Sequence, residues 1–283
     1  MIENKKKRVI IAFFEGVCLI FFLILLTFVL PPKVKHDIYT LRNMLAEDGH
    51  VIHAGGFLRT QEGKTVTYTN SLESLYNLYT NGNRFCEIDL QETWDGIIIC
   101  GHGDERELVY GTGLLPNTSG KDFMKTKIYG EFTSISLHDL AEFMRMHPEL
   151  YVITDVKTDN IKMCSRIAND YPDLQNRFIV QIQLPEEYEP IAALGFRYIM
   201  YPIFKTPDNK RDVWSLAAFA RHHDLVAMII SNGYYTPDLK LSLAAAIIGT
   251  PVILHTLNDE WEINYYLEHH LALAVYTDQT SFH

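Results

Sequence analysis

Short apolar runs that end in polar residues alternate with amphipathic segments along most of the chain. Runs of the first kind are typical of strands, and segments of the second kind are typical of helices. The expected strands are 51–56, 84–93 with a continuation at 97–102, 151–157, 178–183, 198–203, 225–231, 252–258 and 271–278. The expected helices are 71–81, 137–147, 161–171, 187–194, 213–222, 237–248 and 261–269.

This alternation predicts parallel strands joined by helices. With 84–93 and 97–102 counted as one strand, the pattern gives eight strands, which fit an α/β fold of the (β/α)8 TIM barrel type better than an open sheet. The sequence stops five residues after Asp278, so we expect the eighth outer helix to be missing or reduced. A short amphipathic helix at 38–48 is a candidate to cover that gap, and the long loop 103–136 is expected to carry function.

The N-terminal region has a different pattern. Residues 9–30 form a continuous apolar run with one ionisable residue, Glu15, and this run is long enough to cross a bilayer. No small-x-small cleavage site follows it, which favours an anchor over a cleaved signal peptide. Basic residues precede the run, which places the N-terminus in the cytoplasm. We therefore predict a cytoplasmic tail at 1–8, a transmembrane helix at 9–30, a linker with a short helix at 31–50, and an extracytoplasmic barrel at 51–283.

The charge of the chain excludes some partners. It carries 25 basic and 35 acidic residues, a net charge of −10, so neither nucleic acid nor an anionic lipid surface would attract it. A phosphorylated substrate would need local positive charge, which a bound divalent cation commonly supplies.

The four cysteines form no CxxC pair, which argues against a disulfide scaffold or a zinc site. Free thiols are favoured, and Cys86 with Cys100 is the one pair that could form a bridge.

Polar residues fall at the ends of the first three expected strands, where a barrel builds its active site. They are His53, Glu87, Asp89, His102, Asp155 and Lys157. Residues two apart on a strand share a face, so the three carboxylates can converge. Convergent carboxylates need a cation, and oxygen ligands favour Mg²⁺ or Ca²⁺. The two histidines are candidates for general base and general acid. A single polar residue at a strand end is usually structural, and the joint placement is what indicates a site.

The ordered motifs resemble the glycerophosphodiester phosphodiesterase family, within the barrel group that includes phosphatidylinositol-specific phospholipase C. The similar segments are His53-Ala-Gly, Thr69-Asn-Ser-Leu, Glu87-Ile-Asp-Leu followed by Thr93, Asp95-Gly and His102, then Asp155-Val-Lys, Gln181, Thr256-Leu-Asn and Thr277-Asp. The resemblance covers 51–278. It implies metal ligands at Glu87, Asp89 and Asp155, an acid/base pair at His53 and His102, and a phosphate-stabilising role for Lys157.

Three further residues are expected to line the substrate pocket. Gln181 matches a glutamine of the family, and His255 stands where the family commonly has tryptophan. Tyr201 lies near the end of an expected strand, as Tyr234 and Tyr235 do.

Some positions depart from the family pattern. Ala54 stands in place of an arginine and Thr69 in place of a glutamate, so an ion-pairing element is lost. Asp155 is shorter than the family's glutamate, and Gly103 stands where the family has aspartate. These changes favour a phosphodiester bulkier than a small glycerol headgroup.

We therefore expect a metal-dependent phosphodiester hydrolase that acts outside the membrane on a glycerophosphodiester, a lipid headgroup or a glycerol-phosphate surface polymer. Two alternatives stay open from the sequence. One is an enzyme that cuts a lysolipid or sphingolipid headgroup in the manner of phospholipase D. The other is a non-catalytic barrel that binds a phosphate ligand, although the presence of Glu87, Asp89, His53, His102 and Lys157 speaks against it.

Overall fold

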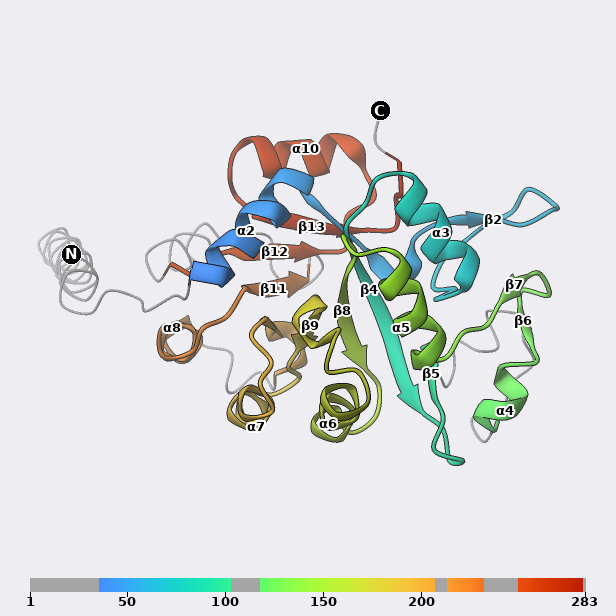
Figure 1. Ribbon diagram of the computed structural model, residues 1–283. Helices are drawn as coiled ribbons and strands as arrows, with labels where there is room; N and C mark the ends of the chain where they lie inside the picture. Colours follow the sequence, from blue (N-terminus) through green and yellow to red (C-terminus); the bar gives the residue numbers. More distant parts are fainter. Residues whose placement is uncertain (1–35, 103–117, 207–212, 232–248, 282–283) are drawn as a thin grey trace, which may run out of the picture.

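The computed structural model describes residues 36–102, 118–206, 213–231 and 249–281. Eight parallel strands close into a barrel, which confirms the predicted fold (Figure 1). Closure is achieved at β1, because Ile52 aligns with Thr277 of β13 on one side and with Cys86 of β4 on the other. In spatial order the strands are β1 (His50–Ile52), β4 (Phe85–Glu92), β8 (Tyr151–Val156), β9 (Phe178–Gln181), β10 (Ile199–Pro202), β11 (Ala227–Ser231), β12 (Val252–His255) and β13 (Ala274–Thr277).

Helices cover the outside of the barrel (Figure 1). They are α3 (Leu72–Thr80), α5 (Leu137–Met146), α6 (Asn160–Asp170), α7 (Tyr188–Ala193), α8 (Val213–His222) and α10 (Glu260–Glu268). Several begin where the sequence places a capping side chain. Ser71 and Ser136 close capping boxes on α3 and α5, and Asp159 accepts a backbone hydrogen bond at the start of α6. The helix expected at 237–248 lies outside the described residues.

Strand alternation divides the apolar side chains into two clusters. Ile88 and Val152 face outward and pack with the helices. Phe85, Ile153 and Ile179 face inward and fill the barrel. The inward positions that follow along β4 and β8 are occupied by carboxylates, so the apolar filling of the barrel gives way to a polar layer at its carboxyl end.

Helix α2 (His36–Asp48) closes the opposite, amino end of the barrel. Its buried side chains Ile38, Leu41 and Leu45 belong to the inward cluster. Arg42 is 7% exposed and donates three hydrogen bonds to the backbone carbonyls of Leu225, Val226 and Gly249, which precede β11 and β12. The expectation that this helix replaces an eighth outer helix is therefore wrong, because its apolar face seals the barrel floor.

The predicted continuation at 97–102 is also corrected. Strand β5 (Ile98–Cys100) runs antiparallel to β4, with Leu90 opposite Cys100. The chain reverses at Thr93–Ile97, where Gly96 has φ +79° and Thr93 donates a backbone hydrogen bond to Ile97.

The long loop expected at 103–136 contains structure in its described part. It includes α4 (Gly120–Phe123) and the hairpin of β6 (Lys127–Ile128) and β7 (Phe132–Thr133). Ile128 and Phe132 pack against the hairpin of β2 (Leu58–Arg59) and β3 (Thr65–Val66). Four short 3-10 helices complete the description: η1 (His53–Gly55), η3 (Gln175–Arg177), η4 (Pro185–Glu187) and η5 (Ile203–Lys205).

Within the described residues, no helix has the length and apolar character needed to cross a membrane. The tail predicted at 1–8 and the transmembrane helix predicted at 9–30 lie outside those residues. Cys86, Cys100 and Cys164 are buried free thiols, so the possible bridge between Cys86 and Cys100 is not formed.

Candidate active site

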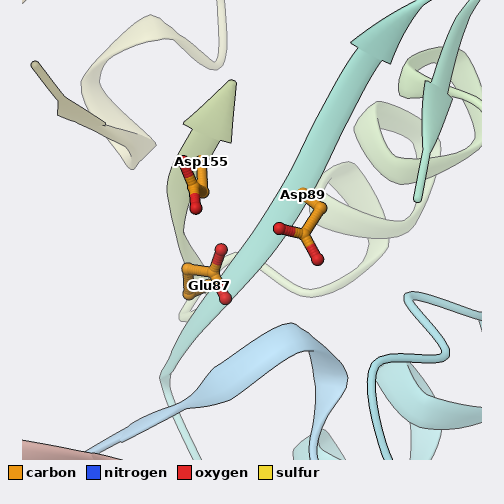
Figure 2. Close-up of side chains that lie close together, drawn as sticks. All are labelled: Glu87, Asp89 and Asp155. Atoms are coloured by element: carbon orange, nitrogen blue, oxygen red, sulfur yellow. The ribbon is translucent and has the colours of Figure 1, made fainter. Parts of the chain in front are cut away.

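Three carboxylates converge at the carboxyl end of the barrel (Figure 2). Glu87 and Asp89 extend from β4 and Asp155 extends from β8, where the strand register places Asp155 beside Asp89. One ligand oxygen of each lies within 4.8 Å of the others. Glu87 and Asp89 are each 2% exposed, so their charges are largely removed from water. The structure thus brings together the three residues that the sequence predicted as metal ligands.

Glu87 lies deepest in this group. Its Oε2 accepts a hydrogen bond of 2.9 Å from the backbone N–H of Ala54, which η1 holds above the end of β1. Burial, and next the neighbouring charge of Asp89, raise the pKa of Glu87 to about 8. In the absence of a cation, this carboxyl group therefore holds a proton at neutral pH.

Asp89 is fixed by Asn70, a residue of the matched Thr69-Asn-Ser-Leu segment. Asn70 Nδ2 donates to Asp89 Oδ2 at 2.9 Å, and Asn70 Oδ1 accepts from the Asp89 backbone N–H at 3.1 Å. Asn70 is fully buried with φ +45°, a left-handed conformation that asparagine tolerates better than most residues. The side chain of Asn70 therefore orients one carboxylate oxygen and leaves the other for a cationic partner.

Two lysines neutralise the carboxylates. Lys157 Nζ lies 2.7 Å from Asp89 Oδ1 and 2.6 Å from Asp155 Oδ2. Lys205, at the end of η5, pairs with Asp155 Oδ1. Burial opposes ionisation of Asp155, but the two ammonium groups outweigh it and lower its pKa to about 2. Sequence reasoning found Lys157. It missed Lys205, because the position of Lys205 depends on the turn after β10.

His53 is oriented by a carboxylate on the neighbouring strand. Its Nδ1 lies 2.9 Å from Oδ1 of Asp278, which follows β13, and its Nε2 lies 3.9 Å from Glu87 Oε2. Asn258 holds Asp278 in place by donating to Oδ2 at 2.7 Å and accepting from the Asp278 backbone N–H at 2.8 Å. Burial lowers the pKa of His53, but the hydrogen bond to Asp278 and the charge of Glu87 raise it further, so the net shift is upward. Asp278 was part of a matched motif but was given no role from the sequence.

His102 reaches the same region from β5, not from the end of a barrel strand. Its ring centroid lies 6.1 Å from that of Tyr68, and the Tyr68 ring lies 4.7 Å from His53. The Tyr68 ring therefore lies near both histidines that are predicted as an acid/base pair. No sequence pattern pointed to Tyr68.

The three predicted pocket residues have different positions. His255 faces His53 with 4.8 Å between ring centroids, and burial together with the charge of His53 lowers its pKa to about 3. Gln181 is an inward residue, 5% exposed, that donates to the Tyr276 hydroxyl at 3.3 Å. Tyr201, by contrast, does not line the pocket. It belongs to the outward cluster, packs on Phe219 of α8 and bonds through its hydroxyl to Thr206. Tyr234 and Tyr235 lie outside the described residues.

The cluster of three carboxylates fits a hard divalent cation. Its donors are all carboxylate oxygens, the ligands that Mg²⁺ and Ca²⁺ prefer. The pairing of Asp89 and Asp155 with ammonium groups shows that the cluster requires positive charge. Glu87, Asp89 and Asp155 would hold such an ion.

Comparison with known proteins identifies the fold. No family model and no curated protein sequence matches the chain. Several solved structures are similar. A candidate glycerophosphodiester phosphodiesterase from Galdieria sulphuraria has a TM-score of 0.63 and 18% identity, covering 81% of this chain and 93% of that one. An Oleispira antarctica phosphodiesterase in complex with the product sn-glycerol-3-phosphate has a TM-score of 0.60 and 20% identity, and the match covers 81% of this chain and 92% of that one. A glycerophosphodiester phosphodiesterase from Parabacteroides distasonis has a TM-score of 0.61 and 12% identity, and the match covers 82% of this chain and 93% of that one. The chain therefore has the closed parallel barrel of the glycerophosphodiester phosphodiesterases.

Proposed function

We propose that the protein is a metal-dependent phosphoric diester hydrolase of the glycerophosphodiester phosphodiesterase type. The observation that carries this proposal is the convergence of three carboxylates, two lysines and an oriented histidine at the carboxyl end of the barrel. Similar barrels in phosphodiesterases support it, as does the bound product of the Oleispira antarctica enzyme. A cation such as Mg²⁺ or Ca²⁺, held by the three carboxylates, would polarise the phosphoryl oxygens of the substrate.

The chain's own residues divide the remaining work. Lys157 lies 20% exposed at the mouth, where its ammonium group can stabilise negative charge that develops on the phosphoryl oxygens. The Asp278 carboxylate binds His53 at Nδ1 and leaves Nε2 to exchange a proton with the attacking or the leaving oxygen. His102, whose ring also lies near Tyr68, is the second residue that can carry a proton.

The proposed substrate is a glycerophosphodiester, a lipid headgroup or a glycerol-phosphate polymer. Ala54 contributes only a methyl group beside His53, and this small side chain is compatible with a substituent larger than glycerol. We also propose that residues 9–30 anchor the protein in the cell membrane with the barrel outside. A reporter fused after residue 283 tests this orientation, and cytoplasmic reporter activity would contradict it.

The activity is tested on the full chain with bis-p-nitrophenyl phosphate and glycerophosphodiesters, in the presence of Mg²⁺, Ca²⁺ or a chelator. We expect turnover that depends on the metal and is lost in His53→Ala and Glu87→Gln. The matched control is Glu142→Gln, because Glu142 is an exposed carboxylate on α5 that pairs with Arg145 away from the site. Turnover that persists in chelator or in Glu87→Gln would contradict the proposal.

Product analysis then distinguishes the reaction types. A cyclic phosphate indicates attack by a hydroxyl group of the substrate, whereas a phosphomonoester with a free alcohol indicates attack by water. If the wild type binds a divalent cation and a phosphate ligand but turns over none of these substrates, the barrel is a binding module and the proposed activity is wrong.

A further inference from the structure

Asp155 is bound by two ammonium groups. Lys157, from the end of β8, contacts Oδ2 at 2.6 Å, and Lys205, from η5, contacts Oδ1. The two lysine side chains are 20% and 23% exposed, so both ammonium groups lie at the edge of the site where a ligand can reach them. Lys157 also contacts Asp89, and it therefore links two carboxylates by itself.

The second ammonium group becomes surplus to Asp155 once a divalent cation is bound. Without a cation Glu87 is protonated, and the two lysines balance the two negative charges of Asp89 and Asp155. Binding of a divalent cation with loss of the Glu87 proton gives the cluster one positive charge overall. A phosphodiester is a monoanion, so the loaded cluster has the complementary charge, provided that both lysines stay in the site.

The position of Lys205 in the barrel determines on which side of the site the positive charge lies. Strand β10, which leads into η5, lies four strands from β1 in the closed barrel, on the side opposite His53. Ala54, the residue next to His53, brings no cation to the β1 side. Among the described residues at this mouth, the ammonium groups that pair with the cluster thus come from β8 and from the turn after β10. A phosphate held between Lys157 and Lys205 would lie across the carboxylates from His53.

We propose that Lys205 is a substrate-binding residue, which pairs with Asp155 in the metal-free protein and binds a non-bridging phosphoryl oxygen of a monoanionic phosphodiester when a divalent cation occupies the carboxylates. This inference rests on the proposed function and deepens it. The competing explanation is that Lys205 serves only to neutralise Asp155. The two explanations differ in what Lys205 does for ligand affinity once Asp155 has a cation.

Calorimetry on the full chain separates them. Mg²⁺ is titrated first for wild type, Lys205→Met and Lys205→Arg. At saturating Mg²⁺, sn-glycerol 3-phosphate is then titrated as a probe, because this phosphomonoester presents the non-bridging phosphoryl oxygens that a diester also has. We expect Lys205→Met to bind Mg²⁺ as tightly as wild type or more tightly, because a competing cation is gone. We expect its affinity for sn-glycerol 3-phosphate to fall about tenfold to a hundredfold, the loss typical of a charged hydrogen bond. Lys205→Arg should retain most of the affinity.

The control is Lys125→Met, which removes one exposed ammonium group from an ion pair with Asp122 and leaves the site intact. In turnover assays Lys205→Met should raise KM with little change in kcat. Wild-type affinity for sn-glycerol 3-phosphate in Lys205→Met would overturn the inference, as would loss of Mg²⁺ binding in that variant. If the wild type hydrolyses phosphodiesters while Lys205→Met keeps its KM, the inference fails and the proposed function stands. If the wild type binds neither Mg²⁺ nor sn-glycerol 3-phosphate, both fail.

Discussion

Replacement of Gly55 by alanine tests how closely the site segment after β1 must approach α3. Gly55 has φ +82°, and a Cβ atom at this position would lie 2.3 Å from Ser74 Oγ and 2.8 Å from Ser74 Cβ. Ser74 belongs to the capping box of α3, so it cannot move away without loss of its hydrogen bonds to Ser71. The substitution therefore combines backbone strain with a steric clash.

The two contributions can be estimated separately. A side chain in the left-handed region costs about 1–2 kcal/mol, and overpacking costs about 1–3 kcal/mol. The expected loss for Gly55→Ala is thus about 2–5 kcal/mol of unfolding free energy. Gly63 offers the matched control, since it has φ +81° and a Cβ atom added there would meet no other atom within 4 Å. Gly63→Ala should therefore cost only the strain, about 1–2 kcal/mol.

Urea unfolding followed by circular dichroism measures these free energies. The double variant Gly55→Ala/Ser74→Gly removes the clash, so its loss should be smaller than the sum of the single losses by about 1–3 kcal/mol. Equal losses in Gly55→Ala and Gly63→Ala would refute the reasoning, and so would additivity in the double variant. Gly55→Ala should also weaken Mg²⁺ binding, because it displaces the adjacent Ala54 amide from Glu87.

Three further predictions concern protonation and the barrel floor. Burial raises the pKa of Glu87 to about 8, so a proton competes with the cation. Mg²⁺ affinity should therefore rise by up to about tenfold per pH unit from pH 6 to 8, with release of a proton on binding. A Mg²⁺ affinity that calorimetry finds independent of pH would contradict this. Asp278→Asn replaces the charged acceptor that raises the pKa of His53 by a neutral amide. The limb of the pH–rate profile that His53 governs should then move to lower pH, with kcat reduced by about 10²–10⁴-fold, and an unmoved limb would assign it to another group. Arg42→Met removes three hydrogen bonds of a buried side chain and should lower the unfolding free energy by about 3 kcal/mol without change in kcat, as checked by urea unfolding and turnover.

The barrel could be predicted from the sequence because strands buried on both faces are continuous apolar runs. The same property hid the hairpin of β4 and β5, since an antiparallel return strand is as apolar as the strand it follows. Only the turn at Asp95 and Gly96 distinguishes the two cases. The position of α2 could not be predicted either, because an amphipathic pattern shows that one face is buried without showing which surface buries it.

The site residues also fall into those that strand geometry predicts and those that it does not. Glu87 with Asp89, and Asp155 with Lys157, are two residues apart on a strand, so local geometry alone puts each pair on one face. The prediction for Tyr201 rested on its place near a strand end and not on this alternation. Tyr201 faces outward, and its neighbour Met200 takes the inward position.

Lys205 and Tyr68 could not be found from local spacing. Lys205 reaches Asp155 through η5, and Tyr68 reaches both histidines from the segment that follows the β2–β3 hairpin. Their positions follow from how the strand connections pack, which strand periodicity does not encode.

The location of α2 also determines how the barrel is tethered. Asp37 pairs with Arg197 before β10, and Asp48 pairs with Arg84 before β4, so α2 crosses the whole floor. The polypeptide before residue 36 therefore joins the barrel at the end opposite the carboxylates. Residues 31–35 can extend by at most about 17 Å. A barrel tethered through residues 9–30 would thus direct its mouth away from its own bilayer. Among the proposed substrates, this orientation favours soluble diesters or surface polymers over the lipid headgroups of the leaflet that holds the protein.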